Sequence, residues 1–230
     1  EGSYLMALKH IAQEIGFDKL KEEKSVNASA GFTFKPVDKL FITLDGYLIK
    51  VKDRIVITSQ FSDASFAAYD VESARFFANA VDTETKGVDL VVSYDWALGG
   101  GNLNINLAGN YTETKITKFN FPEKVLANHS QDEFFGPDQI NIIESLSPKT
   151  KASLGLNYKI NKVNFLVRNT YFGEVTRDGF PYGSVQKFAP KVVTDLSVGY
   201  DITKKLNFTV GANNLFDVFP DLQVYENSYF

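Results

Sequence analysis

The chain alternates apolar and polar residues over many short stretches, and residues 205–217, KLNFTVGANNLFD, show this pattern most clearly. From residue 206 to residue 213 the even positions are apolar and the odd positions are polar or glycine. The apolar set is Leu206, Phe208, Val210 and Ala212. Successive side chains of a β-strand point to opposite faces of a sheet. The pattern therefore predicts a strand with one apolar and one polar face.

The same period recurs along the chain and predicts about eight strands, starting near residues 24, 40, 81, 103, 152, 163, 192 and 205. Short turns are expected at 36–39, 99–102, 161–162 and 203–204, and long loops at roughly 53–78, 119–149 and 177–189, with an extension of the preceding strand through residues 55–57 left open. Short and long connections alternate, so all short turns lie at one edge of the sheet. An up-and-down barrel in an outer membrane has short periplasmic turns and long extracellular loops in this arrangement.

Aromatic residues occur near both ends of the predicted strands. Trp96, Tyr158 and Tyr200 lie beside short turns, whereas Tyr111 and Tyr171 lie toward the long loops. Such rings resemble the aromatic girdles at the two membrane interfaces. Eight residue steps rise about 27 Å at ~3.3 Å each. A tilt of about 40° reduces this to roughly 20 Å, close to the apolar band of such a barrel.

The expected fold is all-β, an antiparallel up-and-down transmembrane β-barrel segment with short periplasmic turns and long extracellular loops. A soluble sandwich or a lipocalin-like barrel also alternates apolar and polar positions, and the pattern alone leaves that alternative open.

Composition narrows the function classes. The 230 residues carry a net charge of −4, which is too mild to indicate a nucleic-acid partner. There is no cysteine, which excludes a disulfide framework and a thiolate metal site. No apolar run approaches the roughly 18 residues of a membrane-spanning helix.

Little in the sequence indicates catalysis. The two histidines are His10 and His129, and the stretch His129-Ser130-Gln131-Asp132-Glu133 is interpreted as a solvated polar loop, because metal sites need three or four convergent ligands. We therefore predict no catalytic, cofactor-binding or metal-binding residue, no cofactor and no enzyme activity. The predicted polar face carries four charges, which we expect to pair structurally: Asp89, Asp95, Arg168 and Asp195.

A strand followed by Asn213-Asn214-Leu215-Phe216-Asp217 resembles the penultimate barrel strand of TonB-dependent outer-membrane receptors, particularly those of Bacteroidota. Residues 20–52, 83–94 and 193–217 resemble successive strands of that barrel. The resemblance implies a barrel of about 22 strands, of which this chain has room for less than half.

The resemblance suggests three regions. Residues 1–23 are expected to form a loop with a short helix, because four apolar residues fall at helical spacing: Leu5, Leu8, Ile11 and Ile15. Residues 24–217 are expected to form the barrel segment, and residues 218–230 a loop before a missing terminal strand. The first residues show neither the basic n-region nor the apolar h-region of a signal peptide, so we expect none in this chain. We therefore expect a C-terminal-side fragment whose N-terminal plug domain and TonB-contacting segment are missing.

The function that the resemblance implies is import of a specific ligand, a siderophore, haem, glycan or peptide, across the Gram-negative outer membrane. The implied partners are outer-membrane lipid, the plug domain of the same protein, TonB through the missing N-terminal part and a ligand at the extracellular loops. No nucleic acid is expected. The alternatives are a passive porin-like or adhesive outer-membrane barrel and a soluble β-rich binding module.

Overall fold

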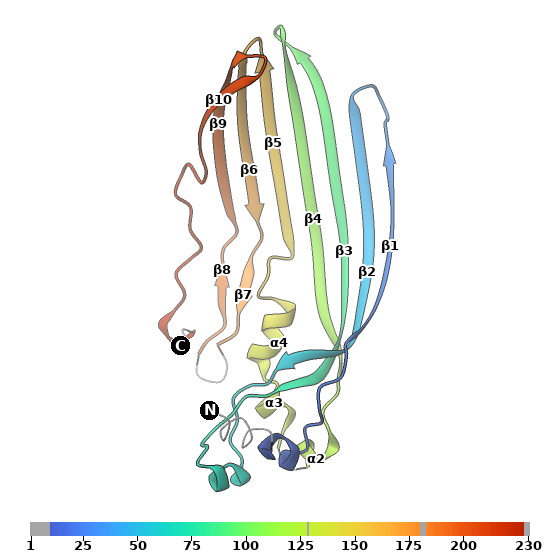
Figure 1. Ribbon diagram of the computed structural model, residues 1–230, viewed down its shortest axis with the longest axis vertical. Coiled ribbons are helices and arrows are strands. Elements are labelled where there is room, and N and C mark those ends of the chain that lie inside the picture. The colour runs from blue at the N-terminus through green and yellow to red at the C-terminus, as the bar shows by residue number, and fades with distance from the viewer. Residues whose placement is uncertain (1–9, 128, 180–182, 228–230) are drawn as a thin grey trace.

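The computed structural model describes residues 10–127, 129–179 and 183–227. Eight strands form one sheet, in which sequence neighbours pair antiparallel in the order β1-β2-β3-β4-β5-β6-β9-β10 (Figure 1). They are β1 (Lys24–Phe34), β2 (Leu40–Ile57), β3 (Phe77–Leu98), β4 (Gly101–Phe119), β5 (Thr150–Ile160), β6 (Val163–Phe172), β9 (Lys191–Thr203) and β10 (Leu206–Ala212).

The remaining elements belong to the long connections. A small hairpin consists of β7 (Val175–Arg177) and β8 (Gln186–Phe188). Residues 10–15 are helical. The other helical turns are η1 (Ala64–Tyr69), α2 (Glu123–Leu126), α3 (Gln131–Phe134), α4 (Pro137–Glu144) and η2 (Tyr225–Asn227). Among the described residues, no helix combines the length and the apolar character needed to cross a membrane.

All four short turns lie at one end of the sheet, as the sequence predicts, and the helices lie at the other end (Figure 1). Turn chemistry explains their positions. Gly99 and Gly100 adopt φ values of 58° and 81°, and Asn161 adopts 52°. Glycine enters this left-handed region without steric cost, and asparagine tolerates it better than most residues.

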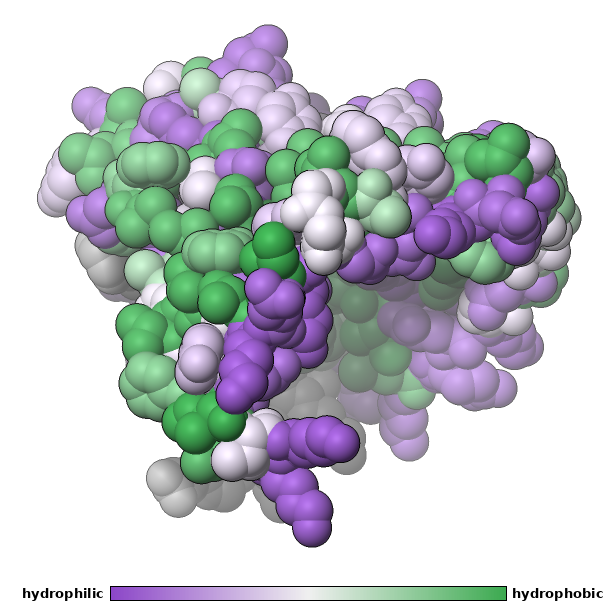
Figure 2. All heavy atoms as spheres, turned by 90° about the horizontal axis from the view of Figure 1, so that it is seen from above, coloured by the Kyte–Doolittle hydropathy of each residue, from purple (hydrophilic) through white to green (hydrophobic). Residues whose placement is uncertain are grey.

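The strand register places polar residues on one face across several strands. Asp89 lies opposite Asn110, and Asp95 lies opposite Asn104. At the alternate positions Val92 lies opposite Leu107, which lies opposite Leu154 on the next strand. Figure 2, viewed from the short-turn end, shows a curved wall whose left limb has apolar residues outside and hydrophilic residues inside the curve. We name these two surfaces the outer face and the inner face.

The sheet is open, as expected for a fragment. In the part of the chain that the structure describes, β1 pairs only with β2, and β10 pairs only with β9. A closed eight-stranded barrel, which would require β1 to pair with β10, is excluded. Residues 214–227 run beside the first half of β9. The Leu215 N–H donates to the Thr194 carbonyl (2.7 Å), and the Asp221 carboxylate accepts from Lys191 Nζ (2.5 Å) and from the Ala189 N–H just before β9 (2.6 Å).

The predicted limits of the first and third long loops are wrong. β2 continues to Ile57 and β3 begins at Phe77, so the first loop covers residues 58–76. The register shifts between Val51 and Arg54, and Asp53 adopts a φ of 55°. This bulge interrupts the alternation from which a strand is recognised, and the sequence therefore left residues 55–57 open between strand and loop. The third loop, predicted to be irregular, contains the β7–β8 hairpin.

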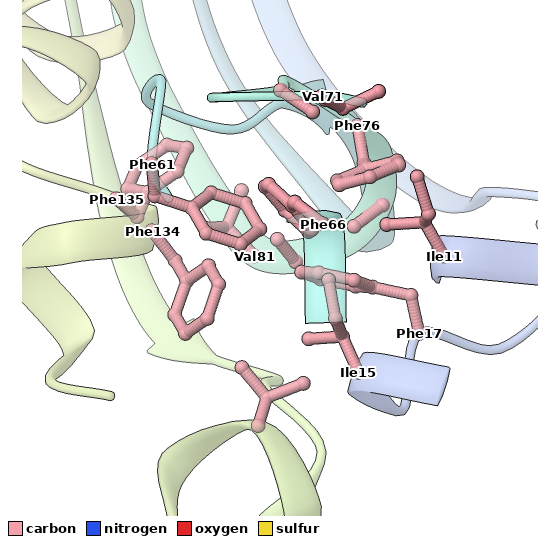
Figure 3. Close-up of a cluster of buried hydrophobic side chains, with 14 residues drawn as sticks. Ile11, Ile15, Phe17, Phe61, Phe66, Val71, Phe76, Val81, Phe134 and Phe135 are labelled. Atoms are coloured by element: carbon pink, nitrogen blue, oxygen red, sulfur yellow. The ribbon is translucent and has the colours of Figure 1, made fainter. Parts of the chain in front are cut away.

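The apolar core lies at the long-loop end of the molecule, among the long loops and the first residues of β3 (Figure 3). Its buried members are Ile11, Ile15, Phe17, Phe61, Phe66, Val71, Ala74, Phe76, Ala78, Ala80, Val81, Val125, Phe134 and Phe135. We name this set the loop cluster. The predicted N-terminal helix is confirmed for residues 10–15, and it is a packed element, because Ile11 and Ile15 are buried in the cluster. Leu5 and Leu8 lie outside the described residues.

Candidate functional site

The inner face carries a polar network across β2, β3 and β4. The Asn110 amide donates to Asp89 Oδ1 at 2.6 Å and lies 3.4 Å from the Tyr47 hydroxyl. A Cβ on Gly87 would collide with the Tyr47 ring, so the missing side chain of Gly87 makes room for that ring. The Asp45 carboxylate lies in the same way over Gly31. Glycines on this face thus let large polar side chains lie flat across neighbouring strands.

A second network lies closer to the short turns. Asp95 Oδ1 accepts from the Asn104 amide at 2.9 Å and from the Asn102 amide at 3.5 Å, and Asn106 donates to Asn104. Asn102, Asn104 and Asn106 therefore form a polar strip on the inner face, and Ala108 separates it from Asn110. Such a strip offers both donors and acceptors to a polar molecule inside the barrel.

Three of the four expected charges are satisfied by groups other than a cation. Asp89 and Asp95 accept from asparagine amides, and Asp195 accepts from the Asn214 N–H at 2.9 Å. Arg168 lies opposite Asp195 in the register. The ion pairs found among residues 10–127, 129–179 and 183–227 involve none of these four charges. Amides and a backbone N–H thus take the place of cations at the three aspartates, and structural pairing of these four charges remains a prediction.

The motif Asn213–Asp217 forms the turn that follows β10. Asn214 adopts a φ of 49° and Asp217 a φ of 53°. The side chain of Asn214 accepts from the Val218 N–H at 2.9 Å and donates to the Val218 carbonyl at 3.1 Å. The Leu215 N–H donates to the Thr194 carbonyl at 2.7 Å, which anchors the turn to β9. The sequence motif therefore has a structural role at the edge of the sheet.

An apolar cavity of ≈ 320 Å³ opens near the long-loop end of β6 and β9. Phe172 and Val193 line it from the sheet, and Phe188 and Phe219 line it from the segments beside the sheet. Phe172 and Val193 occupy the alternate positions of Arg168 and Asp195, which place them on the inner face. The sequence reasoning missed this cavity, because its walls come from four segments that only the fold brings together.

The long loops pack into a structured layer at the end of the sheet opposite the short turns. The Phe61 and Phe134 rings lie 4.4 Å apart at an interplanar angle of 72°, an edge-to-face contact between the first and second long loops. Phe17 joins them at 5.6 Å from Phe134. A run of phenylalanines in stretches read as irregular was the sequence signal for this core, and the sequence analysis did not use it.

His129 connects the same two loops. Its Nε2 lies 2.7 Å from Asp63 Oδ2, and its Nδ1 lies 2.7 Å from Glu133 Oε2. Burial lowers the pKa of His129, but the hydrogen bonds and charges of Asp63 and Glu133 outweigh that effect, so the net pKa is raised. The Ser65 hydroxyl and N–H, followed by His129, lower the pKa of Asp63. The interpretation of residues 129–133 as a solvated loop is wrong for His129, whose side chain is 12% exposed.

No grouping of three or more potential metal ligands occurs among the described side chains. The inner face offers hydrogen-bonding groups, and the loop cluster offers apolar contact. The contact of His129 with Asp63 adds a protonatable link between the loops.

An open, curved antiparallel sheet with an apolar outer face, a polar inner face and long loops at one end defines a wall segment of a transmembrane β-barrel. A family model described as "TonB dependent receptor-like, beta-barrel" matches residues 7–215, and the chain belongs to this family. A search of curated proteins gave no match.

Solved structures of similar fold include the copper transporter OprC, which is 22% identical with a TM-score of 0.58. The match covers 87% of this chain and 27% of OprC. The ferric yersiniabactin uptake receptor FyuA from Yersinia pestis is 18% identical, with a TM-score of 0.55 over 85% of this chain and 25% of the receptor. The ferripyoverdine receptor of the Pseudomonas aeruginosa outer membrane is 18% identical, with a TM-score of 0.55 over 87% of this chain and 24% of the receptor.

The chain thus spans about a quarter of the length of these structures. At these identities the likeness concerns the fold. These structures are of transporters and receptors, and the narrower resemblance to Bacteroidota receptors remains a prediction.

Proposed function

We propose that this chain is part of the barrel wall of a receptor that imports a specific ligand across the Gram-negative outer membrane. The observation that carries the proposal is the family match over residues 7–215. In this role residues 24–217 form the wall, and the inner face borders the plug domain of the same protein. The long loops contribute to ligand capture, and TonB acts through another part of the receptor.

The two faces of the sheet support a position between lipid on the outer face and the plug domain on the inner face. Large apolar side chains remain exposed on the outer face, including Val26 at 70%, Phe208 at 61% and Val210 at 61%. A soluble module would need to cover such a surface, whereas hydrocarbon solvates it. The polar inner face, with Tyr47, Asp89 and Asn110, is suited to contact with a polar plug or ligand.

Names of the structural neighbours suggest which ligands to test first. One neighbour is a copper transporter, one takes up ferric yersiniabactin and one binds ferripyoverdine. The proposal therefore favours a metal or a metal chelate as cargo, with glycans and peptides as further candidates.

The test is uptake by cells that express the full-length receptor containing this segment, in matched strains with and without TonB. Labelled ferric chelates, copper, a glycan mixture and a peptide mixture are supplied in turn. We expect accumulation of one class that requires both the receptor and TonB. Accumulation that requires the receptor but not TonB would indicate a passive porin-like barrel. If no class of ligand accumulates although the receptor is folded in the outer membrane, the result would favour an adhesive barrel.

A further inference from the structure

Two neighbouring turns at the short-turn end of the sheet carry four lysines. Residues 161–162 join β5 to β6, and residues 204–205 join β9 to β10. The Asp201 N–H donates to the Lys162 carbonyl at 2.8 Å, so the two turns are in contact. We name Lys159, Lys162, Lys204 and Lys205 the turn lysines.

Positive charge is in excess at these two turns, although the chain as a whole carries a net charge of −4. Asp201 is the one acidic residue within 157–166 and 199–208, and its carboxylate lies 2.9 Å from Lys159 Nζ. None of the ion pairs found among the described residues involves the other three turn lysines, and each of these three is exposed. Three ammonium groups therefore have no carboxylate partner within the described part of the chain.

The next turn along the sheet, between β3 and β4, does not cancel this excess. It lies beside β5, because the Tyr158 hydroxyl donates to the Leu98 carbonyl at 2.9 Å. Its acidic residue, Asp95, belongs to the inner face and accepts from the Asn104 amide at 2.9 Å. Residues 96–104 carry no charge.

The register places the turn lysines at the border of the apolar outer face. Phe165 lies opposite Tyr158 and Val198, which are outer-face positions of β5 and β9. Tyr200, the next alternate position of β9, lies opposite Phe208. The side chains of Phe165, Tyr200 and Phe208 are 43%, 47% and 61% exposed.

One turn lysine is held directly over this aromatic group. Lys162 Nζ lies 6.0 Å from the centre of the Tyr200 ring. Exposed aromatic rings at the ends of barrel strands mark the membrane interface, where hydrocarbon gives way to lipid headgroups. The ammonium group of Lys162 therefore lies at headgroup level, and the contact with the ring leaves its N–H donors free.

The charge of these turns distinguishes between lipid headgroups. A phosphodiester brings anionic oxygens that accept hydrogen bonds from ammonium groups. A zwitterionic headgroup also brings a cation of its own, which the turn lysines repel, whereas an anionic headgroup brings none. Basic residues near a membrane surface attract anionic lipid.

We propose that the turn lysines, with the rings of Tyr200 and Phe208 beside them, bind an anionic phospholipid of the periplasmic leaflet in preference to a zwitterionic one. The phosphate lies against Lys162 and Lys204, and the acyl chains follow the apolar outer face. The inference rests on the proposed function for the membrane and for the periplasmic position of the short turns. It is independent of which ligand the receptor imports.

The experiment titrates the purified full-length receptor in detergent with phosphatidylglycerol or with phosphatidylethanolamine of the same acyl chains, and native mass spectrometry counts the bound lipid. We expect the wild type to bind phosphatidylglycerol about tenfold more tightly than phosphatidylethanolamine. The variant Lys162→Gln/Lys204→Gln should bind phosphatidylglycerol about tenfold more weakly than the wild type, since each lysine contributes to the attraction. Its affinity for phosphatidylethanolamine should not fall.

The matched control is Lys19→Gln/Lys118→Gln, which removes two exposed lysines near the long loops and should bind both lipids like the wild type. Equal affinity of the wild type for the two lipids would overturn the proposal, as would equal affinity of the wild type and Lys162→Gln/Lys204→Gln for phosphatidylglycerol. Displacement of phosphatidylglycerol by millimolar glycerol phosphate would also overturn it, because the site would then be one for the free anion.

The outcome is separable from that of the proposed function. Loss of lipid selectivity in a receptor that still imports its ligand with TonB would overturn this inference alone. Selective binding of phosphatidylglycerol by a receptor that imports none of the tested ligands would support this inference and count against the proposed function.

Discussion

Individual side chains of this sheet meet two different environments, although they alternate along one backbone. Leu107 points to the outer face, opposite Val92 and Leu154, while its neighbour Asn106 contributes to the asparagine row of the inner face. The same substitution at adjacent positions should therefore have very different effects on stability.

Leu107→Arg in the full-length receptor should lower the free energy of unfolding by roughly 2–4 kcal/mol, because it places a cation near the middle of the apolar band. Urea unfolding of the receptor in lipid vesicles measures this loss. Asn106→Arg is the matched control and should cost much less, since its side chain faces the polar interior. Equal losses for the two variants would show that the assignment of the faces is wrong.

His129 predicts a pH dependence of the contact between the two long loops. Its pKa in the folded protein is raised above the ordinary value of 6.5. The stabilisation that protonated His129 gives to the loop contact is therefore complete below the pKa of His129 in the unfolded chain. It is lost as pH rises through the pKa of His129 in the folded protein. The pKa of Asp63 is lowered, so its contribution is present above its unfolded pKa and is lost as pH falls through the folded pKa.

Amide hydrogen exchange of residues 58–76, corrected for intrinsic rates, measures this effect. Protection should be greater at pH 6 than at pH 9, and His129→Gln should remove the difference. A wild type with the same protection at both pH values would contradict the assigned role of His129.

At the scale of elements, the connections determine the orientation of the sheet in a membrane. The short turns collect at one end, and the loop cluster collects at the other. The first and second long loops pack around shared phenylalanines, so they form one compact unit at the long-loop end of the sheet. An outer-membrane barrel places such long connections outside the cell.

The segment contains no cysteine, so single substitutions provide unique labelling sites within it. Glu72→Cys and Lys124→Cys, both exposed in the long loops, should react with a membrane-impermeant maleimide on intact cells. Lys204→Cys, exposed at a short turn, should react only after the outer membrane is permeabilised. Labelling of Lys204→Cys alone on intact cells would reverse the topology.

At the scale of the whole molecule, the sheet has two free edges. β1 and β10 each have one strand partner within the described residues, and residues 214–227 cover part of the β9 edge through one backbone hydrogen bond and through side-chain contacts. Unpaired backbone groups are costly in hydrocarbon, so the edges require further strands.

Hydrogen exchange should locate these edges. In the isolated chain in detergent, the amides of β1 and β10 that point away from their one partner should exchange quickly. In the full-length receptor the same amides should be protected, while β4 and β5 should be protected equally in both samples. Protection of β1 and β10 in the isolated chain would show that the segment closes on itself or pairs between copies.

The amino-acid sequence by itself determined the features that depend on neighbouring residues. Alternation with a period of two predicted the strands, and residues such as Asn161 and Gly100 predicted the short turns, because side-chain direction and φ preference are local properties. The bulge at Asp53 broke that local signal and left the last residues of β2 open between strand and loop. Only the tertiary structure decided the loop cluster and the contact of His129 with Asp63. Asp63 and His129 are 66 positions apart, and they meet because β3 and β4 bring both long loops to the same end of the sheet.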